Sequence, residues 1–203
     1  MMNNNCGKGL LIVVSAPSGC GKGTILAEIL KDDNYYYSVS ATTRKPREGE
    51  KNGVNYWFMQ EDEFKQLADN GGMLEYAVYC GNYYGTPKKN VDDMLNAGKN
   101  VILEIEVQGA MNIRKICPDA VFIFINPPSF QELQRRLNKR GTESDEVIEQ
   151  RIEQAKKEME FADMYDYVIV NDELENAISD FRSVVRAQQL KVKNKQSASG
   201  GMN

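Results

Sequence analysis

The stretch SAPSGCGKGT, residues 15–24, follows the apolar run Leu10–Val14 and precedes a segment, 25–30, whose apolar residues have helical spacing. A strand, a glycine-rich loop and a helix in this order predict a loop that binds phosphate groups. The glycines permit positive φ angles and a close approach of backbone N–H groups, and Lys22 can reach the β and γ phosphates. The sequence therefore predicts binding of a nucleoside triphosphate, with ATP as the expected nucleotide.

This loop departs from the pattern Gly-x-x-x-x-Gly-Lys-Ser/Thr at two positions. Ala16 stands at the first glycine, and Gly23 stands at the hydroxyl position, with Thr24 one residue further on. Because Gly23 has no hydroxyl, an accompanying Mg²⁺ would be held through water or by Thr24, and no direct metal ligand is assigned. The residues predicted to bind ATP here are Ala16, Pro17, Ser18, Gly19, Cys20, Gly21, Lys22, Gly23 and Thr24.

Three further short runs rich in β-branched residues, Val101–Ile105, Ala120–Ile125 and Tyr167–Val170, read as strands buried on both faces of a parallel sheet. Between the strands, helical spacing occurs at Ile25, Leu26, Ile29 and Leu30, at Phe130, Leu133 and Leu137, and at Ile148, Ile152 and Ala155. Strands that alternate with helices predict an α/β fold with a parallel sheet in three layers, of the P-loop NTPase type.

Two segments interrupt this alternation. Residues 39–86 are rich in Tyr, Gly, Arg and Glu, and are predicted to form a small, mostly β insertion. Residues 135–145, where Gly141 is a typical C-cap and Thr142 or Ser144 can cap the next helix, are predicted to form a short lid. The core domain then comprises 1–38, 87–134 and 146–193, and the polar residues 194–203 are expected to be a flexible tail.

The composition of the 203-residue chain restricts both its partners and its chemistry. A net charge of −4 gives no global positive field for nucleic acid, and Leu10–Val14 is far shorter than the roughly 20 residues of a membrane span. We therefore expect a cytoplasmic protein that binds neither nucleic acid nor a membrane. Its four cysteines lack any Cys-x-x-Cys pair, so we expect them to be reduced thiols. Since there is no histidine, catalysis must rest on carboxylates, Lys, Arg, hydroxyls and backbone amides.

A second group of residues favours binding of another phosphate and a base. Arg44 and Arg47 lie beside hydroxyl residues, as in a bidentate grip on phosphate, and Tyr56 can add a phenolic donor. Glu75 is suited to guanine, because a carboxylate accepts from N1–H and the 2-amino group, which adenine lacks on that edge. Each residue alone is weak evidence, since exposed charges and sheet tyrosines are common, but their combination indicates an acceptor site.

In this order the chain contains SAPSGCGKGT, SATTRKPREGE, NGVNYWF, LEYAVYCGNYYGTP, ILEIEVQGA, PPS, RLNKRGTES and VIVND. This series resembles the guanylate kinase family over about residues 9 to 190. The resemblance implies that the GMP phosphate is held by Ser40, Arg44, Arg47, Tyr56 and Tyr84, and that Glu75 and Thr86 read the guanine.

Glu104 and Glu106 are two apart in a predicted strand and would therefore share one face at its C-terminal end, where ligands of open α/β sheets bind. The resemblance puts Glu104 near Mg²⁺, through water, and phosphate, and Glu106 near the nucleotide. The family more often has Asp here, so the contacts of the longer Glu stay open, as does the alternative that one of the pair faces solvent.

Arg136, Arg140 and Arg151 resemble the family's lid arginines, which close over ATP and the transferring phosphoryl group, and Asn171 resembles a residue near the adenine. For Arg135 and Lys139 we expect a solvated helix face with Glu partners instead. The predicted catalytic residues are Lys22, Arg44, Arg136, Arg140 and Arg151.

The resemblance implies transfer of the γ-phosphoryl group of ATP to GMP with Mg²⁺, giving ADP and GDP in purine nucleotide metabolism. The alternatives are a kinase for another monophosphate, such as AMP or UMP, and a non-catalytic guanylate-kinase-like module that binds a protein. The sequence leaves the oligomeric state open, a homo-oligomer included.

Overall fold

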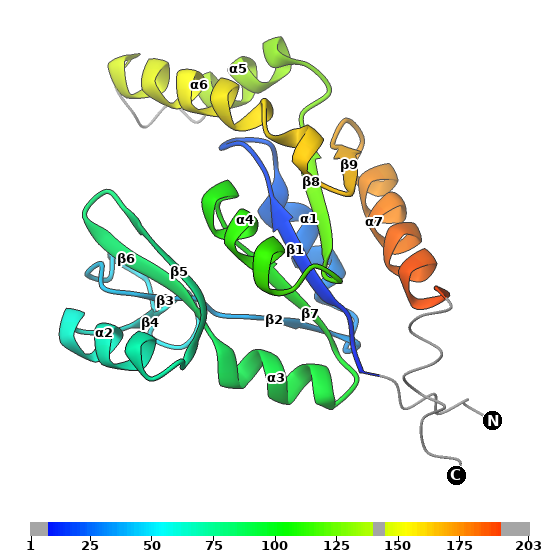
Figure 1. Cartoon of the computed structure of the whole chain (residues 1–203). Helices are drawn as coiled ribbons and strands as arrows, with labels where there is room; N and C mark the ends of the chain where they lie inside the picture. The colour runs from blue at the N-terminus through cyan, green and yellow to red at the C-terminus, as the bar shows by residue number, and fades with distance from the viewer. Residues whose placement is uncertain (1–7, 140–144, 192–203) are drawn as a thin grey trace.

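The structure, a computed structural model, describes residues 8–139 and 145–191 and is built around a five-stranded sheet (Figure 1). Its strand order is β2-β7-β1-β8-β9, and every pairing is parallel. The strands are β1 (Leu11–Ser15), β2 (Tyr35–Tyr37), β7 (Asn100–Glu104), β8 (Val121–Asn126) and β9 (Tyr167–Val170). Because the chain crosses between parallel strands through helices, the ends of β1, β7 and β8 meet at one edge, where ligands of such sheets bind.

Helices cover both faces of this sheet and make three layers. On one face lie α1 (Lys22–Ile29) and α7 (Leu174–Gln189), whose side chains pack on β1 and β8 in one apolar cluster. On the other face lie α3 (Lys88–Asn96) and α4 (Val107–Ile116), in a second cluster. Neighbouring residues of the central strands face opposite clusters, which is why those strands are nearly continuous apolar runs.

A smaller sheet of order β4-β3-β6-β5 forms a second lobe beside the core (Figure 1). Phe64, which is fully buried, anchors helix α2 of this lobe against Ala41 and Met73. The β5–β6 hairpin turns at Cys80 and Gly81, both with positive φ, and then runs into α3. The elements of the lobe are β3 (Ala41–Thr42), β4 (Trp57–Phe58), α2 (Glu61–Asp69), β5 (Met73–Tyr79) and β6 (Asn82–Pro87).

Two helices, α5 (Phe130–Lys139) and α6 (Asp145–Met159), pack against each other above the edge of the sheet where the P-loop lies (Figure 1). Leu133, Leu137 and Ala155 form their shared apolar contact. A 3₁₀ turn, η1 (Ala162–Met164), connects α6 to β9.

The α/β fold with a parallel sheet is confirmed, and the four predicted strands agree with β1, β7, β8 and β9 to within one residue. Strand β2 was not predicted, and the predicted insertion contains helix α2 besides its strands. The division into domains stays a prediction. Gly141, Thr142, Ser144 and the tail 194–203 lie outside the described residues. Within the described ranges, no helix combines the length and apolarity needed to cross a membrane.

Candidate active site

The P-loop connects β1 to α1, and its conformation requires glycine at two positions. Gly19 and Gly21 have φ angles of 89° and 86°, in the left-handed region that favours glycine. A Cβ atom at Gly19 would lie 2.7 Å from Leu137, and one at Gly21 would lie 2.4 Å from Asn171. Residues 16–24 line a cavity of about 750 Å³ together with Glu106, Gln150, Arg151, Gln154 and Glu158.

Cys20 supports the loop from inside the protein. Its thiol is buried and donates to the carbonyl of Ile125 at 3.1 Å. Burial raises the pKa of Cys20 to about 12, because a thiolate would lose its solvation there. Cys20 is therefore a packed thiol rather than a reactive one. Cys80 and Cys117 are also free cysteines, and Cys6 lies outside the described residues.

Lys22 begins α1, and its ammonium lies 3.5 Å from a carboxylate oxygen of Glu104 at the end of β7. The other oxygen of Glu104 accepts a hydrogen bond of 3.1 Å from the hydroxyl of Tyr37 at the end of β2. Burial, followed by the charge of Glu104, raises the pKa of Tyr37, so its hydroxyl remains a donor. Sequence reasoning missed Tyr37. It lies three residues before Ser40, and no local pattern connected it to Glu104.

The prediction that Glu104 and Glu106 share one strand is wrong. Strand β7 ends at Glu104, and Glu106 is the N-cap of α4, because the chain leaves the sheet at Ile105. Both carboxylates nevertheless line one cavity, and Glu106 also lines the P-loop cavity. Burial raises the pKa of Glu106, an effect that nearby Lys22 opposes.

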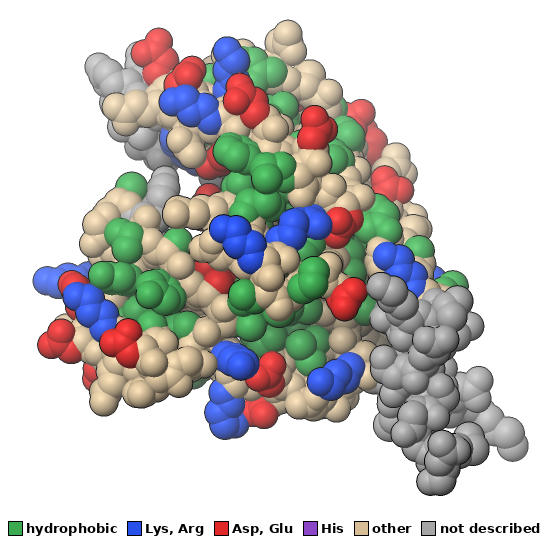
Figure 2. Space-filling view, viewed as in Figure 1, with side chains coloured by type: hydrophobic (Ala, Val, Ile, Leu, Met, Phe, Trp, Pro, Cys, Tyr) green, Lys and Arg blue, Asp and Glu red, His purple; other side chains and the backbone are tan. Residues whose placement is uncertain are grey.

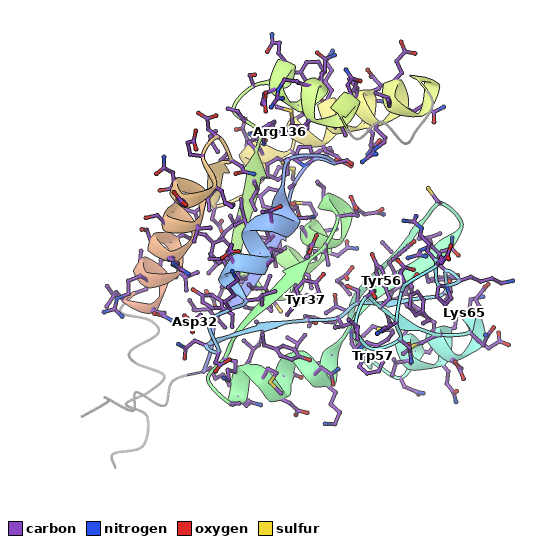
Figure 3. The ribbon with its side chains drawn as sticks, turned by 180° about the vertical axis from the view of Figure 1, so that it is seen from behind. Asp32, Tyr37, Tyr56, Trp57, Lys65 and Arg136 are labelled. Atoms are coloured by element: carbon purple, nitrogen blue, oxygen red, sulfur yellow. The ribbon has the colours of Figure 1, made fainter. Side chains whose placement is uncertain are left out.

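A second cavity, of about 330 Å³, is lined by residues of the core and of the smaller lobe. On the surface, Figure 2 shows a notch between this lobe and the α5–α6 helices. Figure 3 shows Tyr37 on the core and Tyr56 on the smaller lobe, and both residues line this cavity. The predicted residues that line it are Lys22, Ser40, Arg44, Arg47, Tyr56, Glu75, Tyr84, Glu104 and Glu106. Those that sequence reasoning did not single out include Tyr37, Glu50, Asn55, Gln108 and Gly109.

Arg44 is oriented by Glu50 and by two aromatic rings. Its two terminal nitrogens donate to the two carboxylate oxygens of Glu50 at 3.0 and 2.9 Å. The guanidinium carbon lies 5.4 Å from the ring centre of Tyr56 and 5.8 Å from that of Phe58. Glu50 also accepts from the backbone N–H of Arg47 at 2.7 Å, so one carboxylate organises the segment that carries both arginines.

Glu75 lies on β5, lines this cavity and is 9% exposed. One of its oxygens accepts from the hydroxyl of Thr86 on the paired strand β6 at 2.9 Å. Burial raises the pKa of Glu75 to about 7, although the hydroxyl of Thr86 opposes the shift. A Cβ atom at Gly109 would lie 3.0 Å from the other oxygen, so glycine on α4 leaves space beside the carboxylate.

Of the predicted arginines on α5 and α6, Arg151 contacts the P-loop, whereas Arg136 contacts the chain just after β9 and lines neither cavity. Arg151 donates to the Ser18 hydroxyl at 2.7 Å. Arg136, labelled in Figure 3, donates to the backbone carbonyl of Asn171 at 3.1 Å and to Glu132 at 2.8 Å. Arg135, as expected, is exposed and pairs with Glu132, whose pKa the two arginines lower to about 2. The predicted Arg140 lies outside the described residues.

Comparison with known proteins gives one consistent result. Residues 8–188 match the family model described as guanylate kinase. A guanylate kinase of Latilactobacillus sakei is 50% identical over 187 residues, which cover 91% of this chain and 92% of that protein. One from Listeria monocytogenes serotype 4b is 52% identical over 186 residues, which cover 91% of each chain. The crystal structure of guanylate kinase from Anaplasma phagocytophilum superposes with a TM-score of 0.75 at 37% identity, and the match covers 92% of this chain and 89% of that one.

Proposed function

The chain belongs to the guanylate kinase family, whose members transfer a phosphoryl group from ATP to GMP, and we propose how its residues perform this transfer. One observation carries the proposal: the P-loop cavity and the cavity of the smaller lobe share the side chains of Lys22 and Glu106. Two substrates bound in these cavities would meet at Lys22. This is the geometry that direct transfer between two nucleotides needs.

The cavity of the smaller lobe binds GMP. Its phosphate is held by Arg44 and Arg47 with the hydroxyls of Ser40, Tyr56 and Tyr84, all of which line the cavity. Glu75 accepts from the N1–H and the 2-amino group of guanine, and Thr86 fixes the orientation of its carboxylate. Adenine offers neither donor on that edge, so a buried carboxylate would be left unpaired with AMP.

The P-loop cavity binds the triphosphate of ATP. Backbone N–H groups of the loop and the N-terminus of α1 face the phosphates, and Lys22 reaches the γ phosphate. Arg136 and Arg151 act from the α5–α6 side and stabilise charge on the transferring group. For Arg140, which lies outside the described residues, the same role stays a prediction from the resemblance. Closure of these helices over the nucleotide excludes water from the reaction.

The reaction needs no strong base, which explains how a chain without histidine performs it. The GMP phosphate is already an anionic nucleophile, so the protein must mainly align its oxygen with the γ phosphorus of ATP. The cations Lys22 and Arg44 line the cavity of the smaller lobe, and Arg136 would join them when α5 closes over the nucleotide. Since GMP and GDP are purine nucleotides, the reaction belongs to purine nucleotide metabolism. The cytoplasmic location stays a prediction.

The residues present fit a Mg²⁺ ion that arrives with ATP. Among the described residues, no group of three or more carboxylates, cysteines or histidines could hold a metal, so the protein has no complete cage of its own there. Mg²⁺ commonly binds to substrate phosphates, water and one or two protein oxygens, and Thr24 and Glu104 can supply those oxygens here. The ion would neutralise charge on the β and γ phosphates.

A coupled assay for ADP, with MgATP as donor and GMP, dGMP, AMP or UMP as acceptor, tests the proposal. We expect turnover with GMP and strong discrimination, by a factor of about 10⁴, against AMP. Preference for AMP or UMP would identify a kinase for another monophosphate. No ADP formation with any acceptor would favour a non-catalytic module that uses the same fold.

A further inference from the structure

Asn171 lies beneath the P-loop, at the point where β9 ends. Its backbone N–H donates to the carbonyl of Asn126 at 2.8 Å, so the residue continues the pairing of β9 with β8. Its side chain is 7% exposed, and its amide nitrogen donates to the carbonyl of Cys20 at 2.7 Å. The sheet thus fixes the backbone of Asn171, and the side chain extends from this fixed position to the loop.

The bond to Cys20 determines how one peptide group of the loop is oriented. In a trans peptide the C=O and the following N–H point in opposite directions. Since the Cys20 carbonyl is directed at Asn171, the N–H of Gly21 is directed away from it, on the side of the P-loop cavity. Within the residues that the structure describes, this N–H donates to no other group, so it is available for a phosphate oxygen.

The same side chain explains the glycine at the N-cap of α1. A Cβ atom at Gly21 would come within 2.4 Å of the Asn171 amide nitrogen, so the amide and the loop are in direct contact. Asn171 is also absent from the described residues that line the P-loop cavity. Its amide therefore contacts the loop itself, at Cys20 and Gly21.

We propose that Asn171 is a positioning residue, whose amide fixes the Cys20–Gly21 peptide so that the Gly21 N–H binds a phosphate of the triphosphate. This rests on the proposed function of the loop as the triphosphate site. The proposal gives the Asn171 side chain a role in phosphate binding, through the orientation of the Gly21 N–H. The family resemblance alone placed Asn171 near the adenine.

The backbone of Asn171 has a separate connection to the site. Its carbonyl accepts a hydrogen bond of 3.1 Å from Arg136 on α5. A substitution of the side chain leaves this carbonyl in place, because the backbone is held by its pairing with Asn126. Changes at Asn171 therefore test the orientation of the loop without removing the acceptor of Arg136.

The test separates the two halves of ATP by competition against MgATP, with inorganic tripolyphosphate as the phosphate half and adenosine as the base half. Asn171→Asp keeps the size of the side chain but replaces the N–H donor with an oxygen that faces the Cys20 carbonyl. Asn171→Ala removes the amide. For both variants we expect the Ki of tripolyphosphate and the KM of MgATP to rise together by about tenfold, and the Ki of adenosine to stay unchanged.

Asn138→Ala is the matched control, because Asn138 is exposed on α5 and lines neither cavity. It should leave all three constants unchanged. Thermal unfolding and the affinity for GMP, whose cavity does not include Asn171, show that each variant is folded.

Two results would overturn the inference. A rise in the KM of MgATP with an unchanged Ki of tripolyphosphate would make Asn171 a ligand of the nucleoside, and no change in either would leave the amide without a role. Failure of the proposed function looks different. The wild-type protein would then bind tripolyphosphate in a direct calorimetric titration, and the Asn171 variants would bind it more weakly, but no ADP would form with GMP.

Discussion

The affinity for GMP should depend on pH through Glu75. Burial raises the pKa of this carboxyl to about 7, but only the charged form can accept both donors of guanine. The apparent dissociation constant then exceeds its limiting value by the factor 1 + 10^(pKa−pH), which is about 11 at pH 6 and about 1.1 at pH 8. We therefore expect GMP to bind about tenfold more tightly at pH 8 than at pH 6.

The same shift has an opposite effect on folding. A carboxyl whose pKa is higher in the folded state binds its proton more tightly there, so its contribution to stability is present at low pH and is lost as the pH rises. Between the ordinary value of 4.5 and about 7, this amounts to about 3 kcal/mol. Glu75→Gln, which stays neutral, should therefore be more stable than the wild type at pH 8 and similar to it at pH 5.

Isothermal titration with GMP at pH 6, 7 and 8 measures the effect, and two variants control it. Because the phosphate of GMP also titrates, near pH 6, Glu75→Gln supplies the pH dependence that does not come from the carboxyl. Thr86→Val removes the hydroxyl that lowers the pKa of Glu75, so it should move the midpoint of the binding curve to higher pH. If the wild type and Glu75→Gln show the same dependence on pH, Glu75 does not titrate in this range and the reasoning is refuted.

Three further substitutions test the remaining contacts. Lys22→Met should lower kcat by about 10³ or more while thermal unfolding changes little, and near-normal kcat would remove Lys22 from the mechanism. Tyr37→Phe removes the donor to Glu104 and should lower kcat by about two- to tenfold with the KM for GMP unchanged; an unchanged kcat would contradict a positioning role. Arg44→Lys cannot form two parallel bonds to phosphate, so the KM for GMP should rise by about tenfold or more, and an equal KM would show that one charge suffices.

The main sheet could be predicted from sequence because its central strands are buried on both faces. Leu10–Val14 and Ala120–Ile125 carry no polar residue, and a short apolar segment bounded by loops is typical of a strand in the middle of a parallel sheet. The P-loop could also be predicted from sequence, since its glycines and Lys22 serve a function that depends on local backbone geometry. Features of this kind are encoded within a few consecutive residues.

The features that were missed depend on partners distant in the chain. Strand β2 consists of three tyrosines at the sheet edge, and only its pairing with β7, more than 60 residues later, makes it a strand. For the same reason, the hydrogen bond from Tyr37 to Glu104 could not be predicted from sequence. The break between β7 and α4, which separates Glu104 from Glu106, is set by where the sheet ends, and the sequence EIEVQGA has no glycine or proline at that point.

The charges of the site show why composition alone could not reveal it. Lys22, Arg44 and Arg136 each face a carboxylate of the same chain, respectively Glu104, Glu50 and Glu132. All six side chains are mostly withdrawn from solvent, and an unpaired charge is unfavourable there, so the carboxylates keep the cations in place before substrate phosphates bind. On the proposed binding scheme, a substrate phosphate would replace the carboxylate as the anionic partner of each cation. A net charge of −4 is therefore compatible with the proposed binding of two polyanionic nucleotides, because that proposal needs only a few cations at particular positions and no positive field over the whole chain.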